Sequence, residues 1–282
     1  MKMIECPRDA MQGIHEFIPT SIKADYINRL LKVGYDTIDF GSFVSPKAIP
    51  QLRDTSEVLS ALDLSSTSSK LLAIIANLRG GEDAVKFDEI KYLGFPFSIS
   101  ETFQQRNTNS SIEQSLKTVE NLQRLCSNNH KELVVYISMA FGNPYGDKWN
   151  EEIAFNWVNS IQQLGVKIVA LSDTVGVATP KAINSIFSHL IPALPSVEFG
   201  AHLHCTADNW KQKVDAAFSA GCRRFDSAIK GLGGCPMAED DLVGNLASES
   251  LLSFLNEKKV IIDLDTAAFA EAMLFSDLVF TS

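Results

Sequence analysis

The chain has 282 residues, of which 45% are hydrophobic and 21% charged, an ordinary composition for a soluble globular enzyme. This length fits a single (β/α) barrel, a fold of about 250 residues, and the net charge of -9 argues against a nucleic acid or an anionic membrane as partner. We find no long apolar segment, no room for a signal peptide before the first apolar run, and five cysteines without paired spacing, a combination that predicts a cytoplasmic protein.

Short apolar runs alternate with amphipathic segments along the whole chain. Strands are expected at residues 3–7, 37–42, 70–76, 91–98, 132–139, 167–172, 197–204 and 223–229. Helices are expected at 20–33, with Thr20 as N-cap, and at 49–62, 111–127, 151–164, 180–193, 207–220 and 245–257. Between the third and fourth strands, Gly80-Gly81 precedes only a brief helical stretch.

Eight βα units with nearly continuous apolar strands predict an α/β protein with a closed parallel barrel rather than an open sheet. We therefore predict a (β/α)8 TIM barrel that makes residues 1–282 a single domain, with the barrel over about 3–257. The last apolar stretch, about 265–280, is expected to form a closing helix packed on the barrel.

Polar residues follow most of the predicted strands, at the end of the barrel where chemistry collects. They are Arg8, Asp9 and Gln12 after the first strand, Asp39 and Ser42 at the second, Ser100 and Glu101 after the fourth, Asn143 after the fifth, Asp173 at the sixth, and His202 and His204 at the seventh.

The pair His202 and His204 is the strongest single signal, because alternate residues of a strand point to the same face. Together with Asp9 and a fourth donor from Asn245, the pair could bind Mg, Mn or Zn. Two other interpretations stay open: the histidines could be hydrogen-bonded core residues, and Asn245 could be the N-cap of the helix that follows it.

Cys235 lies in a glycine-rich loop after the eighth strand, in the sequence GLGGCP. A thiol in such a loop over the barrel mouth could transfer a proton or act as a nucleophile, or it could be buried and inert. We interpret Cys126 and Cys222 as inert and Cys6 as a packing residue, leave Cys205 undecided, and assign no role to His15, His130 and His189.

Taken together, the motifs resemble those of hydroxymethylglutaryl-CoA lyases, a family of metal-dependent TIM-barrel enzymes, over essentially the whole chain. The matching segments are MIECPRDAMQ, DFGSFVSPKAIPQ, SDTVGVATP, AHLH, and GLGGCPMA with the later GN. The first and the fourth are shared with related synthases, whereas SFVSPK and GLGGCP are particular to the lyases.

The resemblance implies the chemistry and the residues that perform it. It implies cleavage of 3-hydroxy-3-methylglutaryl-CoA to acetoacetate and acetyl-CoA, with a divalent cation, Mg or Mn rather than Zn, bound by Asp9, His202, His204 and Asn245. It further implies that Arg8 stabilises the enolate, that Cys235 is the general acid, and that His202 and Asp173 assist proton transfer. The acyl-CoA substrate would contact Arg8, Gln12, Asp39 and Ser42, and the protein would form a homodimer.

Several positions depart from the family pattern. Ala10-Met11 replaces Gly-Leu, the segment from Cys235 to Asn245 is one residue longer, and no cysteine for redox control follows near the C-terminus. Asp39 stands where better-known members carry a glutamate that holds the arginine. Because Asp is one methylene shorter, we expect it to reach Arg8 only through a shifted backbone or a water molecule.

Three other functions compete with the lyase interpretation. A Claisen-condensing synthase of the isopropylmalate or homocitrate type would share the metal residues, but such synthases lack the cysteine of GLGGCP and usually add a regulatory domain. A metal-dependent aldolase acting on a hydroxy-oxo acid is a further alternative. A barrel without catalysis, serving as a binding subunit, is disfavoured because each proposed site position carries a competent residue.

Overall fold

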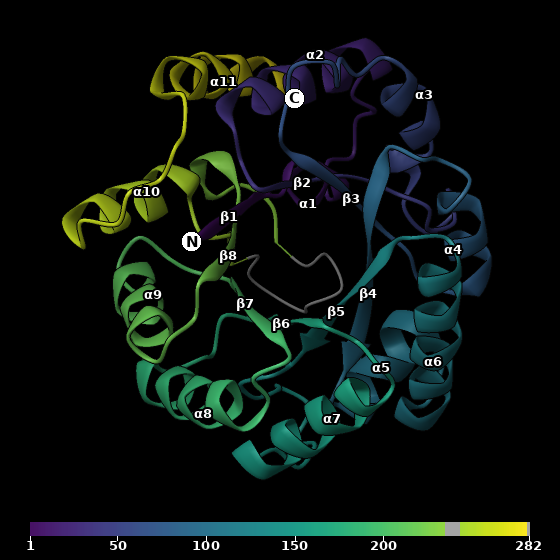
Figure 1. Cartoon of the computed structure of the whole chain (residues 1–282), viewed down its shortest axis with the longest axis vertical. Helices are drawn as coiled ribbons and strands as arrows, with labels where there is room; N and C mark the ends of the chain where they lie inside the picture. The colour runs from purple at the N-terminus through teal and green to yellow at the C-terminus, as the bar shows by residue number, and fades with distance from the viewer. Residues whose placement is uncertain (235–242, 281–282) are drawn as a thin grey trace.

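The computed structural model describes residues 1–234 and 243–280. Within these residues eight parallel strands pair in chain order and the last pairs with the first, so the sheet closes into a barrel (Figure 1). The strands are β1 (Lys2–Glu5), β2 (Thr37–Ser42), β3 (Lys70–Ile74), β4 (Ile90–Ser98), β5 (Glu132–Ser138), β6 (Ile168–Asp173), β7 (Glu198–Leu203) and β8 (Arg224–Ser227). The predicted (β/α)8 barrel is confirmed.

The helices lie around the barrel, most of them as an outer ring, with α1 nearer the centre of the view (Figure 1). They are α1 (Pro7–Gln12), α2 (Thr20–Val33), α3 (Thr55–Ser60), α4 (Leu78–Ala84), α5 (Glu101–Thr108), α6 (Ile112–Asn128), α7 (Glu151–Gln163), α8 (Pro180–Ala193), α9 (Trp210–Ser219), α10 (Ser248–Glu257) and α11 (Thr266–Val279), with short 3-10 turns η1 (Pro50–Leu52) and η2 (Ile229–Gly231). Because helices cover the outer face of the sheet while side chains fill its inside, the strands are buried on both faces.

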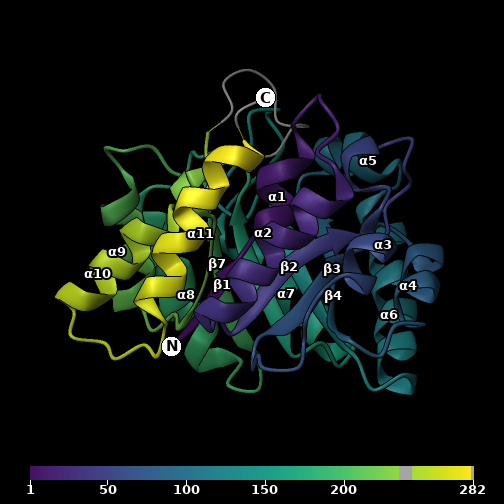
Figure 2. The ribbon, with the colours of Figure 1, turned by 90° about the horizontal axis from the view of Figure 1, so that it is seen from above.

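Two short helices, α1 and α5, extend the barrel at the carboxyl ends of β1 and β4 and were not predicted (Figure 2). Pro7 occupies the first turn of α1, where its missing N–H removes no hydrogen bond. Ser100 caps α5 by accepting a hydrogen bond from the backbone N–H of Phe103. The helix α1 matters for the site because it carries Arg8 and Asp9.

Three predicted helices differ in their details. The segment 49–62 forms η1 and α3 instead of one helix, because the non-helical Asp54 interrupts it. The predicted cap Thr20 is the first residue of α2, and Pro19 precedes it. The glycines Gly80 and Gly81 lie inside α4 rather than before it. A Cβ at Gly80 would lie 2.7 Å from the carbonyl oxygen of Phe43, which explains the glycine at this position.

The predicted closing helix is present as α11 and packs against α2. Asp265 caps it by accepting from the backbone N–H groups of Ala267 and Ala268. Tyr26 of α2 contacts the rings of Phe275 and Phe280 at centroid distances of 6.4 and 5.8 Å. Within the described residues, none of these helices is both long and apolar enough to cross a membrane.

Candidate active site

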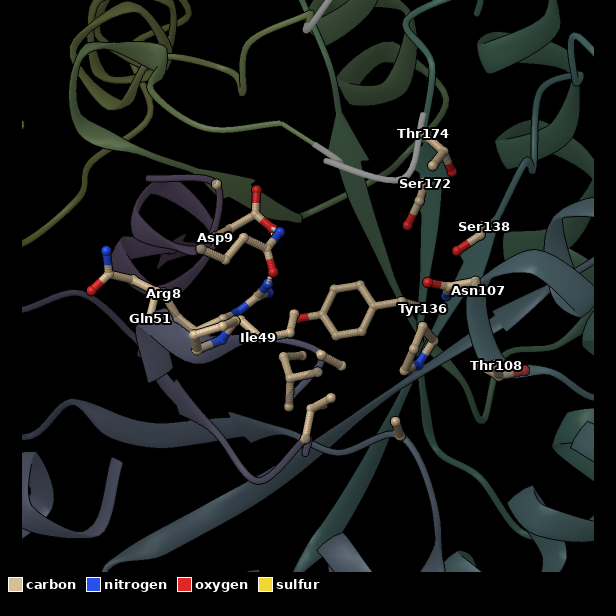
Figure 3. A pocket seen from close by; sticks show the side chains of 18 of the residues that line it. Arg8, Asp9, Ile49, Gln51, Asn107, Thr108, Tyr136, Ser138, Ser172 and Thr174 are labelled. Carbon is tan, nitrogen blue, oxygen red and sulfur yellow. Dashed lines mark hydrogen bonds and ion pairs between the residues drawn. The ribbon is translucent and has the colours of Figure 1, made fainter. Parts of the chain in front are cut away.

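A cavity of about 460 Å³ opens at the carboxyl ends of the strands. Arg8 and Asp9 lie on one side of it and Ser138, Ser172 and Thr174 on the other, with the Tyr136 ring between them (Figure 3). Gln12, His202 and His204 also line this cavity. The structure thus brings together residues that are far apart in the sequence and that follow the first and seventh predicted strands.

Arg8 is held in place by three side chains that use all its nitrogen atoms. Its Nη1 donates to Asp9 Oδ1 and to Gln12 Oε1, each at 2.9 Å, while its Nε and Nη2 donate to Asp39 Oδ2 at 2.9 and 2.5 Å. Burial opposes the charge of this guanidinium, but the charges of Asp39 and Asp9 raise the pKa of Arg8 above its ordinary value. Arg8 is therefore a fixed cation whose orientation is set by its neighbours.

Asp39 reaches Arg8 directly, without a bridging water. The pairing of β2 with β3 shifts register between Asp39 and Gly41, so a shifted backbone does accompany the shorter side chain. A Cβ at Gly41 would lie 2.6 Å from Thr55 Cγ2, which explains the glycine beside this shift. Burial raises the pKa of Asp39 to about 6 against the opposing effect of Arg8.

Asp9, His202 and His204 offer one ligand atom each within 4.8 Å of one another. His204 Nδ1 lies 2.9 Å from the carbonyl oxygen of Thr174, which can only accept, so this nitrogen carries the proton. Its Nε2 is buried and has no hydrogen-bond partner within the described part of the chain. A buried lone pair facing a carboxylate and a second imidazole is suited to a divalent cation, and the donor set fits one.

The protonation of Asp9 and His204 agrees with cation binding. Burial raises the pKa of Asp9, but Arg8 and the two imidazoles outweigh it and lower this pKa overall. Burial, assisted by His202, lowers the pKa of His204 to about 4, so its imidazole is neutral at physiological pH. A carboxylate and a neutral imidazole are the forms of these side chains that bind metals.

Asn245 touches this cluster and is not a helix cap. Its Nδ2 donates to Asp9 Oδ2 at 2.7 Å and to the carbonyl oxygen of Leu232 at 2.8 Å, and its backbone pairs with His204. The following helix begins at Ser248 with Ala247 as N-cap, so the capping interpretation was wrong and the predicted helix 245–257 starts three residues late. With the amide nitrogen committed, the Oδ1 atom of Asn245 is the one left for a cation.

Two other predicted site residues lie behind the cavity wall as the described residues form it. Ser42 Oγ donates to the carbonyl oxygen of Ile74 at 3.3 Å and accepts from the Val44 N–H at 3.1 Å. Asp173, 1% exposed, accepts from Lys213 Nζ at 2.6 Å and from the Ala178 N–H at 2.9 Å. The predicted substrate contact of Ser42 and the predicted proton-transfer role of Asp173 stay predictions. So does the substrate contact of Asp39, which hydrogen-bonds Arg8.

Other polar strand ends have structural roles. Asn143 Oδ1 accepts from the N–H groups of Tyr145 and Asp147 and so builds a turn. Asp147 in turn accepts from Ser100 Oγ, next to the predicted Glu101, and thereby links the loops after β4 and β5. Their polarity is explained without a ligand.

The cysteines that the structure describes are buried and unpaired with one another. Burial raises the pKa of the thiols of Cys126, Cys205 and Cys222 to about 12, which makes them inert, and the undecided Cys205 joins this group. Cys6 is 1% exposed, as expected of a packing residue, but it follows β1 as the N-cap residue of α1 instead of lying inside the strand. Cys235 lies outside the described residues, so its predicted role stays a prediction.

The sequence interpretation missed several residues that line the cavity. They include His15, Phe17 and Arg53 from the loops after β1 and β2, and Tyr136 and Thr174 near the ends of β5 and β6. Tyr136 and Ser138 alternate at the end of a strand, a signal of the same kind that His202 and His204 gave. The loop residues carry no comparable pattern.

A family model described as HMGL-like matches residues 4–275 of the chain. The chain belongs to the HMGL-like family. A 3-hydroxy-3-isohexenylglutaryl-CoA/hydroxy-methylglutaryl-CoA lyase of Pseudomonas aeruginosa is 33% identical over 94% of this chain and 88% of its own length. The cytoplasmic 3-hydroxy-3-methylglutaryl-CoA lyase of Rattus norvegicus is 31% identical over 96% of this chain and 79% of its own.

Solved structures of this family share the same barrel. An HMG-CoA lyase from Acinetobacter baumannii in complex with coenzyme A and 3-methylmalate superposes with a TM-score of 0.90 at 31% identity, covering 99% of this chain and 90% of that one. The resemblance drawn from the sequence motifs is thus confirmed, and this HMGL-like chain is an enzyme of the carbon–carbon lyase class.

Proposed function

We propose that this HMGL-like enzyme cleaves 3-hydroxy-3-methylglutaryl-CoA into acetoacetate and acetyl-CoA. One observation carries the proposal: the guanidinium of Arg8, fixed by Asp39, lies beside the cluster of Asp9, His202 and His204 in a single cavity. In this reaction the C3 hydroxyl loses its proton, the C2–C3 bond breaks, and C2 of the released acetyl-CoA enolate takes up a proton. The reaction needs stabilisation of the negative charge on the enolate and of the negative charge on the hydroxyl oxygen. The fixed guanidinium would serve the first, and a cation held by the oxygen and nitrogen ligands would serve the second.

Asp9, His202, His204 and Asn245 would hold the divalent cation, which we propose to be Mg or Mn. A cation held there would supply Lewis-acid chemistry that lowers the free energy of the alkoxide formed from the substrate hydroxyl. The carboxylate of Asp9 and the amide oxygen of Asn245 are hard donors, which favours these metals over Zn.

Arg8 would stabilise the negative charge that develops on the thioester oxygen during bond cleavage. Its hydrogen bonds to Asp39, Asp9 and Gln12 fix its orientation before substrate binds, so little reorganisation accompanies the reaction. Gln12 lines the cavity and would contact the substrate. Asp39 and Ser42 would act from behind the cavity wall: Asp39 holds Arg8, and Ser42 holds the loop after β2.

The proton transfers would involve three residues. Cys235 would donate the proton to C2 of the enolate, and His202, which lines the cavity, would share in moving the hydroxyl proton. Asp173 would support these steps by position: Lys213 binds it and also donates to the carbonyl oxygen of His204 at 2.9 Å. This arrangement ties the loop after β6 to the strand that carries the histidines.

A second candidate substrate is a 3-hydroxyglutaryl-CoA with a larger apolar branch than methyl at C3, since apolar side chains of Ile49, Ile74 and Pro96 line the cavity. The Pseudomonas aeruginosa relative is named for both the methyl and the isohexenyl compounds. The coenzyme A in the Acinetobacter baumannii structure supports an acyl-CoA as the ligand class. We also propose that the protein is a homodimer, from the family resemblance, and that it is cytoplasmic, from its cysteines without paired spacing.

A coupled assay of acetyl-CoA release tests the proposal, using a panel of 3-hydroxyacyl-CoAs that includes the methyl and isohexenyl compounds, with Mg, Mn or EDTA. We expect turnover that needs the metal and that EDTA removes. Turnover of none of these compounds would contradict the lyase assignment. Turnover of a hydroxy-oxo acid instead would favour the aldolase. Cys235→Ala should abolish most turnover while Mn binding is retained; an unchanged rate would remove Cys235 from the reaction.

A further inference from the structure

His202 is in contact with a buried carboxylate that does not line the cavity. Asp226 of β8 stands opposite His202 in the pairing of β7 with β8, and its Oδ2 lies 3.1 Å from His202 Nδ1. The Asp226 side chain is 1% exposed, so the contact is shielded from water. Because paired residues on adjacent parallel strands point to the same face, both side chains enter the barrel.

A carboxylate at this depth requires a reason, since barrel interiors are normally filled by branched apolar side chains. An isolated buried charge is costly unless it is paired. Asp226 has one hydrogen-bond partner, the imidazole of His202. Arg224, two residues earlier on the same inward face and also 1% exposed, is a nearby charge whose own ion pair is with Glu198 at 3.3 Å. Burial opposes the charge of this guanidinium, but the nearby Asp226 raises the pKa of Arg224.

The contact defines which nitrogen of His202 is available to a cation. A carboxylate oxygen accepts, so His202 Nδ1 carries the proton toward Asp226 and Nε2 is the nitrogen left for a cation. His204 has the same arrangement, with the Thr174 carbonyl oxygen on Nδ1 and a buried Nε2. Both histidines are thus held by a second residue in the form that binds metal through Nε2.

We propose that Asp226 is a positioning residue that fixes the ring orientation and the Nδ1–H form of His202 for cation binding. The inference rests on the proposed function, because it needs a cation at Asp9, His202 and His204. It is the counterpart of the contact between Asp39 and Arg8: in each case a buried carboxylate on a neighbouring strand orients a cavity residue through one oxygen. In both carboxylates the Oδ1 atom has no hydrogen-bond partner among the residues described.

The test measures Mn²⁺ binding to the substrate-free protein by electron paramagnetic resonance, for the wild type, Asp226→Asn and Glu5→Gln. Glu5→Gln is the matched control: it also removes a buried carboxylate, from the adjacent strand β1, but Glu5 contacts Ile229 and Ser248 rather than the cluster. We expect Asp226→Asn to weaken Mn²⁺ binding about 10- to 100-fold. Glu5→Gln should leave the affinity close to that of the wild type.

Equal Mn²⁺ affinity of the wild type and a folded Asp226→Asn would overturn the inference alone. A wild type that binds no Mn²⁺ would overturn the proposed cation site and this inference with it. Where Asp226→Asn does not fold, long-range proton–nitrogen correlation spectra of ¹⁵N-histidine-labelled wild type with Mg²⁺ decide the question. We expect the proton of His202 on Nδ1, and a proton on Nε2 instead would contradict the proposal.

Discussion

Asp39 holds Arg8 through a single oxygen atom: Oδ2 accepts hydrogen bonds from both Nε and Nη2, while Oδ1 accepts none from the described residues. The guanidinium therefore presents its Nη1 side toward Asp9 and Gln12, next to the cation site. A shorter acid performs the positioning expected of a glutamate because the backbone of β2 shifts register beside it.

Replacing Asp39 with Asn should lower kcat about 10- to 100-fold, because the charge-assisted hydrogen bonds that orient Arg8 are lost. The pKa of Asp39 is about 6, so the wild-type rate should fall as the pH drops through this value and the carboxylate gains a proton. Steady-state rates from pH 5 to 8 check both points. If the rate of Asp39→Asn falls at acidic pH as it does in the wild type, the fall is caused by another group.

Gly233→Ala should weaken both metal binding and stability. Gly233 has φ of +95°, and a Cβ there would lie 2.8 Å from Ala10 Cα, from the Asp9 carbonyl oxygen and from Asn245 Nδ2. Gly146→Ala is the matched control, because Gly146 also has a positive φ, +76°, but nothing lies within 4 Å of its Cβ position. Thermal unfolding should show backbone strain of about 1 kcal/mol in both variants. Mn²⁺ affinity should fall only in Gly233→Ala, and an equal affinity in the two variants would count against close packing at the site.

The metal should stabilise the folded protein, since a preformed cluster rarely exists in the unfolded chain. A concentration 100 times the dissociation constant should add about 2.7 kcal/mol to the free energy of unfolding. We expect Mg²⁺ or Mn²⁺ to raise the melting temperature, EDTA to reverse the rise, and His204→Ala to remove most of the effect. A melting temperature that changes with neither added metal, EDTA nor the His204→Ala substitution would contradict the assignment of this cluster as the cation site.

Glu5 should make the protein less stable as the pH rises. Burial raises the pKa of Glu5 from 4.5 to about 7, although Ser248 and Ile229 donate hydrogen bonds to it. Between these two values the folded protein keeps a proton that the unfolded chain releases, so the free energy of unfolding falls with increasing pH. The loss should reach about 3 kcal/mol by pH 8.

Glu5→Gln should lack this loss, because the amide cannot ionise. Urea unfolding of the wild type and the variant at pH 5.5 and pH 8 measures the difference, and the variant should gain relative to the wild type at the higher pH. An identical change in both proteins would show that other groups cause it.

Much of the architecture and part of the site could be predicted from local pattern. The alternation of buried strands and amphipathic helices determined the (β/α)8 barrel, because each strand must be buried on both faces and each helix on one. The spacing of His202 and His204 determined that they share a face, since strand geometry has a period of two. The exact helix starts were harder to predict, because the same polar residue types occur in the first turn, at the cap and before it. Thr20 is the first residue of α2, and Asn245 lies two residues before Ala247, the N-cap of α10.

Contacts between strands do not follow from local pattern. From the amino-acid order alone, Asp39, His202 and Asp226 can be placed on or beside strands, but their partners depend on strand register and on one local shift in β2. Asn245 lies at the cluster because its backbone pairs with His204, a contact between segments 41 residues apart in which no local preference is involved. Closing the barrel fixes the registers of all eight strands together, and this closure places the residues that orient Arg8 and the histidines.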